Sequence, residues 1–155
     1  MHTIRLRGPW QLEPLARYVL RAGRWEPSTE GLPGGARMTM PDDWSAAFGA
    51  DFLGRVRYDR VFQSPTGLES GERVFLVVEP PRSQGMVSLS GRQLGEVRQG
   101  GLPLRFDITE QLQDHNRLEV VVEHPSLDDA EPSHDDNVTS SPGGLIGEVR
   151  LEIEE

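Results

Sequence analysis

Short apolar runs separated by glycine and proline are the feature that most constrains how this chain can fold. In the runs 118–123 and 149–154 an apolar residue stands at every second position: Leu118, Val120 and Val122 alternate with Glu119, Val121 and Glu123, and Val149, Leu151 and Ile153 alternate with polar residues. Each run is therefore expected to bury one face and expose the other. The run Val74 to Val78 is apolar on both faces, as expected of a central strand. The 17 glycines and 12 prolines fall mostly between such runs and indicate frequent turns.

This spacing predicts an all-β fold, an antiparallel β-sandwich of two stacked sheets, because strands joined directly by turns leave no room for crossover helices. Further strands are expected over residues 4–6, 18–20, 38–40, 56–62, 86–89, 93–97 and 104–108. A short helical segment is expected at 44–48 and a single turn at 109–112. Residues 22–36 and 125–142, rich in glycine, proline and polar side chains, are predicted to be loops.

Length and composition limit the number of domains, the possible chemistry and the possible partners. The 155 residues suit one domain, 1–155, and the absence of cysteine excludes disulfides and a thiolate nucleophile. A net charge of −9 disfavours nucleic acids and anionic lipid surfaces as partners. No apolar run approaches the roughly 20 residues needed to cross a bilayer, and residues 1–10 lack a secretory apolar block. Compartment and oligomeric state stay open.

Seven short sequence motifs, taken in order, resemble the N-terminal sugar-binding domain of family 2 glycoside hydrolases, the β-galactosidase and β-glucuronidase group. They lie at residues 40–44, 54–62, 73–76, 87–95, 103–109, 116–120 and 143–149, and read MPDDW, GRVRYDRVF, RVFL, VSLSGRQLG, PLRFDIT, NRLEV and GGLIGEV. The last phrase departs from the family pattern, because Gly147 stands where an arginine is common and Glu148 follows it.

The resemblance implies a jelly-roll of the galactose-binding-domain-like type. It also implies a non-catalytic accessory domain, because the catalytic glutamates of that family belong to a separate barrel domain. The expected partners are a carbohydrate or such a catalytic barrel. From the residues themselves, no Gly-x-Ser-x-Gly elbow is present and the four histidines show no paired metal-ligand spacing. We therefore expect no catalytic residue, cofactor or metal in this chain.

Sugar binding needs an aromatic ring beside a pyranose and a few fixed polar groups. The candidate carbohydrate-binding residues are Trp25, Trp44, Asp136, Asn137 and Glu148. Trp44 has a second interpretation as a core anchor, since it follows a Pro-Asp-Asp turn that belongs to the fold, whereas Trp25 lies in a predicted loop.

Two alternatives remain at this point. The acidic residues of the 125–142 loop are oxygen ligands of the kind that calcium takes, but their spacing matches no EF-hand, and a mobile acidic loop is the favoured interpretation. The function is either recognition of a carbohydrate by loops at one end of the sandwich, or structural docking against a catalytic barrel or another protein without a sugar ligand.

Overall fold

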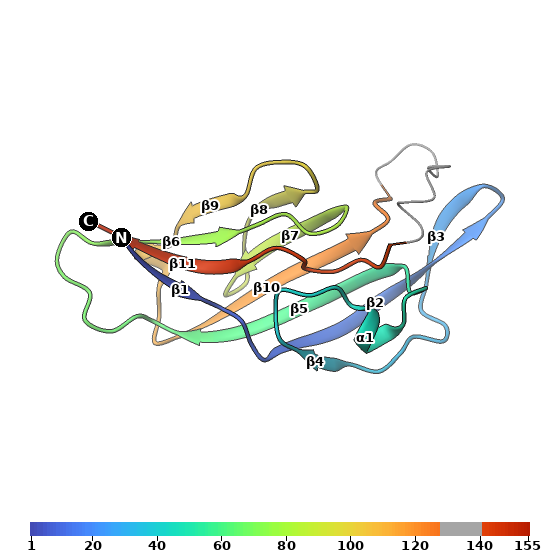
Figure 1. Ribbon diagram of the computed structural model, residues 1–155, viewed down its shortest axis with the longest axis horizontal. Coiled ribbons are helices and arrows are strands. Elements are labelled where there is room, and N and C mark those ends of the chain that lie inside the picture. Colours follow the sequence, from blue (N-terminus) through green and yellow to red (C-terminus); the bar gives the residue numbers. More distant parts are fainter. Residues whose placement is uncertain (128–140) are drawn as a thin grey trace.

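The computed structural model describes residues 1–127 and 141–155, and these residues form two antiparallel sheets stacked face to face. In Figure 1 the two layers run along the long axis of the molecule, and both chain termini lie together at one end. The predicted antiparallel sandwich is confirmed, and its topology is consistent with a jelly-roll.

The four-stranded sheet has the order β1-β11-β6-β9. Its strands are β1 (His2–Arg5), β6 (Arg73–Val78), β9 (Leu104–Asp107) and β11 (Val149–Glu154).

The seven-stranded sheet has the order β3-β2-β5-β10-β7-β8, and β4 also pairs with β2. Its strands are β2 (Trp10–Arg21), β3 (Arg24–Ser28), β4 (Ala36–Met38), β5 (Gly54–Gln63), β7 (Gln84–Leu89), β8 (Arg92–Arg98) and β10 (His115–His124).

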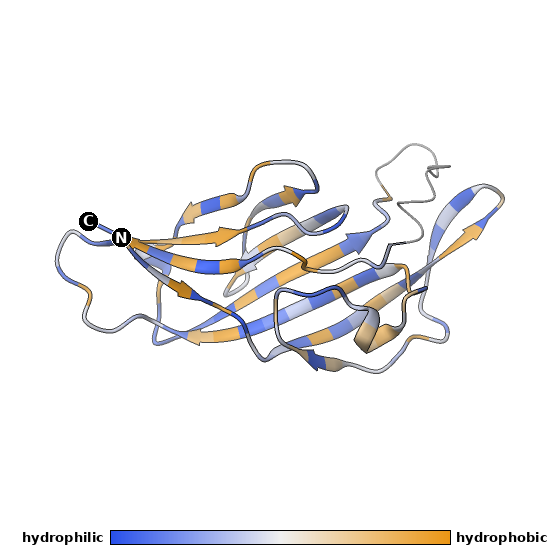
Figure 2. Cartoon of the chain, in the orientation of Figure 1, coloured by the Kyte–Doolittle hydropathy of each residue, from blue (hydrophilic) through white to orange (hydrophobic). Residues whose placement is uncertain are grey.

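The core lies between the sheets and is built by the alternation seen in the sequence. Along β10 the residues Leu118, Val120 and Val122 are fully buried while their neighbours are less so. Along β11, Val149 and Leu151 do the same from the opposite layer. Figure 2 shows this alternation as orange and blue bands along the strands. Period-two patterning therefore decides which face of each strand becomes dry.

The helical content matches the expectation, with α1 (Ser45–Phe48) and the single 3₁₀ turn η1 (Thr109–Gln111). Neither of these helices, within the described ranges, is long and apolar enough to span a membrane.

The N-terminal third departs from the sequence-based expectation. The strand predicted at residues 18–20 is the last part of β2, which has twelve residues. The segment 22–36, predicted to be a loop, contains the strand β3. Together β2 and β3 form a hairpin that projects from the end of the sandwich opposite the termini (Figure 1). The glycines and prolines of this segment suggested a loop. The same residues also occur in the turns of hairpins, so they do not distinguish a hairpin from an irregular segment.

Candidate functional site

Trp44 is a buried part of the core. Its side chain is 0 % exposed, and its indole N–H donates a hydrogen bond to the carbonyl of Phe52 at 3.0 Å. The Phe52 ring lies edge-on to it at 5.5 Å, and a side chain added at Gly143 would collide with it. No face of the ring is open to a ligand, so Trp44 is a core anchor and does not serve as a sugar platform.

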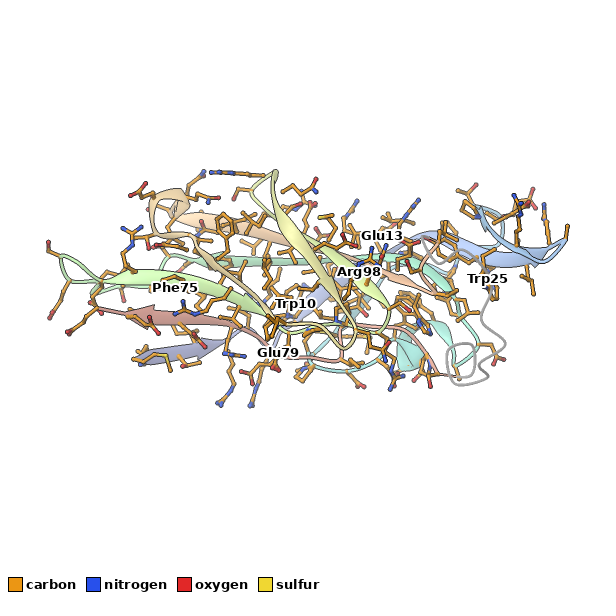
Figure 3. The ribbon with its side chains drawn as sticks, turned by 90° about the horizontal axis from the view of Figure 1, so that it is seen from above. Trp10, Glu13, Trp25, Phe75, Glu79 and Arg98 are labelled. Atoms are coloured by element: carbon orange, nitrogen blue, oxygen red, sulfur yellow. The ribbon has the colours of Figure 1, made fainter. Side chains whose placement is uncertain are left out.

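Glu148 lies on the outer face of the four-stranded sheet. Its carboxylate pairs with Arg5 at 3.0 Å and with Arg150 at 3.5 Å. Its backbone N–H donates to the Glu79 carboxylate at 3.2 Å. In Figure 3 Glu79 lies near the middle of the molecule and Trp25 lies towards the hairpin end. The structure therefore does not bring Glu148 and Trp25 into one site.

The other two candidates, Asp136 and Asn137, lie outside the described residues, as does most of the acidic segment considered for calcium. Within residues 1–127 and 141–155 no group of three or more acidic or histidine side chains is arranged to hold a metal ion.

A β-bulge at Leu15 changes which face the end of β2 presents. Pro14 pairs with the core residue Val56, but Ala16, not Leu15, pairs with the next residue, Arg55. Pro14 has no N–H to donate to a neighbouring strand, which makes it a residue commonly found at such bulges. Because residues opposite each other share a face, Ala16 points outward where an unbroken strand would point it to the core.

Beyond the bulge, Tyr18 and Leu20 share the outward face of Ala16. Opposite them on β3 stand Pro27 and Trp25, respectively. Tyr18 is only 4 % exposed, although it does not belong to the core cluster formed by the described residues. Leu20 is 55 % exposed, and Trp25 is partly exposed. The hairpin thus carries an aromatic and aliphatic surface outside the sandwich core.

Polar side chains from three neighbouring strands meet this surface. Arg55 of β5 stands opposite Glu123 of β10, which in turn stands opposite Gln84 of β7. The Gln84 amide donates to one carboxylate oxygen of Glu123 at 2.8 Å, and the backbone N–H of Leu127 donates to the other at 2.7 Å. We refer to Tyr18, Trp25, Arg55, Gln84 and Glu123 as the hairpin cluster.

The hairpin cluster holds unused hydrogen-bonding groups. Among the described residues the buried Gln84 amide oxygen has no hydrogen-bond partner, and the buried Tyr18 hydroxyl lies beside Glu123 and Arg55 without a hydrogen bond of good geometry. Burial raises the pKa of the Tyr18 hydroxyl, the nearby Glu123 carboxylate raises it further, and Arg55 opposes both. The hydroxyl therefore stays protonated and can both donate and accept.

His124, next to Glu123, is hydrogen-bonded to two segments outside β10, at Ser83 and Ser141. Its Nε2 lies 2.8 Å from the Ser141 carbonyl, which can only accept, so Nε2 carries the proton. In the neutral ring Nδ1 then accepts from the Ser83 hydroxyl at 2.6 Å. Leu127 and Ser141 are thus held by adjacent residues of β10. This makes His124 a structural tie beside the hairpin cluster.

Sequence reasoning found Trp25 and missed the other four members of the hairpin cluster. Arg55 and Glu123 read as ordinary charged residues on the wet faces of strands, and Gln84 likewise carries no distinguishing pattern. The available signal was Pro14, since a proline within a strand pattern indicates a bulge or an edge. It could not have revealed which strands lie opposite.

Solved structures with the same fold were found by comparison. An FMN-binding β-glucuronidase from Facaelibacterium prausnitzii L2-6 superposes with a TM-score of 0.73 and 23% identity, over 98% of this chain and 22% of that one. A Bifidobacterium dentium β-glucuronidase, complexed with coumarin-3-O-glucuronide, gives 0.68 and 24%, over 97% and 29%. A β-glucuronidase from glycoside hydrolase family 2 gives 0.67 and 19%, over 99% and 18%.

The chain has the fold of one part of these β-glucuronidases. It spans less than a third of each of them, a share that fits a single N-terminal domain, and the resemblance seen in the sequence is confirmed at the level of fold. No protein-family profile matches the chain. No curated protein matches it either.

Proposed function

We propose that this chain acts as a non-catalytic, carbohydrate-binding accessory domain of a family 2 glycoside hydrolase. The observation that carries the accessory role is coverage: nearly the whole chain superposes on a minor part of enzymes named as β-glucuronidases. In this proposal the catalytic carboxylates are supplied by a barrel domain with which this sandwich associates.

The hairpin cluster supports the carbohydrate-binding part of the proposal. Sugars present both apolar C–H patches and hydroxyl groups, so they bind where a ring adjoins fixed donors and acceptors. Trp25 and Leu20 supply the apolar surface. Arg55 supplies donors, and the Tyr18 hydroxyl and the Gln84 amide oxygen are polar atoms that form no hydrogen bond of good geometry among the described residues.

The test is a glycan array followed by calorimetry on the strongest hit. Trp25→Ala should weaken binding by about tenfold or more, because the contact between an aromatic ring and a sugar contributes on the order of 1 kcal/mol or more. Leu102→Ala is the matched control, since Leu102 is 88 % exposed and belongs to the β8–β9 connection. Loss of affinity in both variants, or in neither, would contradict the assignment.

A second candidate function is protein docking. The exposed pair of Leu20 and Trp25 on a projecting hairpin also suits an apolar groove on a catalytic barrel. Two results together would favour docking over sugar binding. The chain would bind no glycan on a broad array, and Trp25→Ala would weaken its association with a barrel domain supplied as a separate chain.

A further inference from the structure

The pairing of β2 with β5 ends at the base of the projecting hairpin. The outermost pair is Arg17 with Gly54, and the Tyr18 N–H donates to the Leu53 carbonyl at 2.8 Å. Beyond this point β2 pairs with β3, from Arg17 opposite Ser28 outwards. Figure 1 shows this part of the hairpin extending past the sheets. The contacts at the base therefore decide where the outer residues of the hairpin lie.

Gly54 allows β2 and β5 to approach closely at this base. A Cβ atom added to Gly54 would collide with the Ala16 carbonyl and would meet the Phe52 ring at 3.1 Å. Gly54 lies on the same side of β5 as the core residue Val56, so Arg17, which stands opposite it, points to the core side. The missing side chain at Gly54 thus leaves the space beside the Phe52 ring to Arg17.

The Arg17 guanidinium joins the core to the second strand of the hairpin. Its central carbon lies 5.5 Å from the centroid of the Phe52 ring, within the range of a cation–π contact. One terminal nitrogen donates at 3.3 Å to the carbonyl of Gly31, in the segment after β3. Phe52 in turn packs against Trp44 and Phe48, with ring centroids 5.5 and 5.3 Å apart. Arg17 therefore connects the hairpin base to aromatic rings that are fixed by their packing.

We infer that Arg17 is a positioning residue, which sets the direction of the hairpin and so fixes the place of Trp25. Trp25 stands opposite Leu20, three residue pairs further out and on the other face of the hairpin, roughly 10 Å along the strand. A two-stranded hairpin is only marginally stable by itself, whereas a binding site needs its groups held to within about 0.5 Å. The effect of Arg17 on sugar binding rests on the proposed function, but its effect on the hairpin does not.

Residual dipolar couplings of the ¹⁵N-labelled chain measure the direction of the hairpin relative to the sheets. In the unaltered chain the backbone couplings of residues 19–26, and that of the Trp25 indole, should fit the same alignment as those of β6 and β10. Arg17→Ala should reduce the hairpin couplings by about half and raise amide exchange there about tenfold, with exchange in β6 unchanged. Arg17→Lys should do nearly the same, because an ammonium cannot lie flat on a ring while a second nitrogen donates to a carbonyl.

Arg21→Ala is the matched control. Arg21 belongs to the same strand, and its exposed side chain pairs with Glu26 at 3.9 Å, so its loss should leave the couplings and the exchange unchanged. A hairpin that stays ordered in either Arg17 variant would overturn the inference, and so would equal loosening in Arg21→Ala. Arg17→Lys keeps an unbranched side chain with a positive charge, and it decides the test if Arg17→Ala does not fold.

Affinity for the strongest sugar from the glycan array separates this inference from the proposed function. Arg17→Ala should weaken binding about fivefold without changing the preference among sugars, because the contacting groups stay the same but are held less firmly. A loosened hairpin with unchanged affinity would contradict the positioning role. If the unaltered chain binds no sugar, the proposed function fails, and the couplings still decide whether Arg17 directs the hairpin.

Discussion

The two sheets differ in how fully their buried polar atoms are hydrogen-bonded among the described residues. On the four-stranded sheet, Arg150 pairs with Glu79, Glu148 and Glu152 at 2.9 to 3.5 Å. Arg105, two strands away, pairs with Glu152 at 3.3 Å and lies over the Phe75 ring at 3.7 Å.

One apolar side chain is buried beneath these ion pairs of Arg150 and Arg105. Val77 stands opposite Arg150 on one side and opposite Arg105 on the other, and it is almost fully buried although it lies on an outer face. The stems of arginine side chains cover apolar surface in this way while their charged ends stay paired. This face has its charges matched within the chain.

The seven-stranded sheet contrasts with that arrangement. Among the residues that the structure describes, the buried polar atoms without a partner are Arg17 Nε, the Tyr18 hydroxyl, Arg60 Nε and Gln84 Oε1. All four belong to strands β2, β5 and β7 of this sheet. Buried groups of this kind cost free energy unless something satisfies them. The contrast supports the larger sheet as the location of the proposed binding surface.

The largest effect is expected from the core that both faces share. Trp44→Ala removes a fully buried ring and should lower the free energy of unfolding by about 3 to 5 kcal/mol. Urea unfolding followed by circular dichroism measures this, with Trp25→Ala changing stability by less than about 0.5 kcal/mol as the comparison. A loss below about 1 kcal/mol for Trp44→Ala would show that the ring is not an anchor.

An intermediate effect is expected on the four-stranded face. Glu152 is 12 % exposed, and its pKa lies below the usual range because Arg150, and then Arg105, donate to it. The folded pKa is thus lower than the unfolded value of about 4.3, so the stabilisation is present above that pH and is lost as the pH falls through the folded pKa. Glu152→Gln should cost about 1 kcal/mol at pH 7.

The same variant should flatten the acid limb of a stability profile measured by urea midpoints between pH 7 and pH 2, and should leave ligand binding unchanged. Glu96→Gln, at an exposed pair with Arg98, serves as the control and should alter stability little. An unaltered acid limb in Glu152→Gln would show that this network does not stabilise the fold.

The smallest effect distinguishes the only two tyrosines. Tyr18→Phe deletes a hydroxyl that makes no hydrogen bond of good geometry among the described residues, so stability should stay level or rise by up to about 1 kcal/mol. Tyr58→Phe deletes a hydroxyl that accepts the Leu145 N–H at 3.4 Å, so stability should fall by about 1 kcal/mol. Calorimetry on the same pair should show weaker sugar binding only for Tyr18→Phe. Similar losses of stability in both variants would show that the Tyr18 hydroxyl is hydrogen-bonded as firmly as that of Tyr58.

Much of the fold was open to prediction from the sequence, and the clearest cases were the strands with strict alternation. The strand predicted from Val149 to Ile153 is β11, and the fully apolar run at 74–78 lies within β6, at the centre of its sheet. The strand β3 was missed because residues 22–36 are rich in glycine and proline, and most of β2 was missed because the bulge at Leu15 changes the face of the residues that follow it. An inserted residue reverses the faces of all residues that follow it in the strand, so a prediction from simple alternation assigns those side chains to the wrong face.

The candidate site was less accessible to prediction. Trp25 was found because an aromatic residue among turn residues stands out, whereas Arg55 and Glu123 resemble other charged residues on strand faces. Trp44 was open to two interpretations, since a sequence does not show whether a ring beside a turn is covered. Its burial by Phe52 settles the matter in favour of the core.

The sequence by itself determined that two antiparallel sheets would stack, because alternating apolar residues can be buried only by a second sheet. It also carried the resemblance to a domain of family 2 glycosidases. The tertiary structure alone decided that Tyr18, Arg55, Glu123 and Gln84 would meet, since they come from four strands whose order and register are not local properties. Periodicity acts along one strand, whereas a binding surface is made across several.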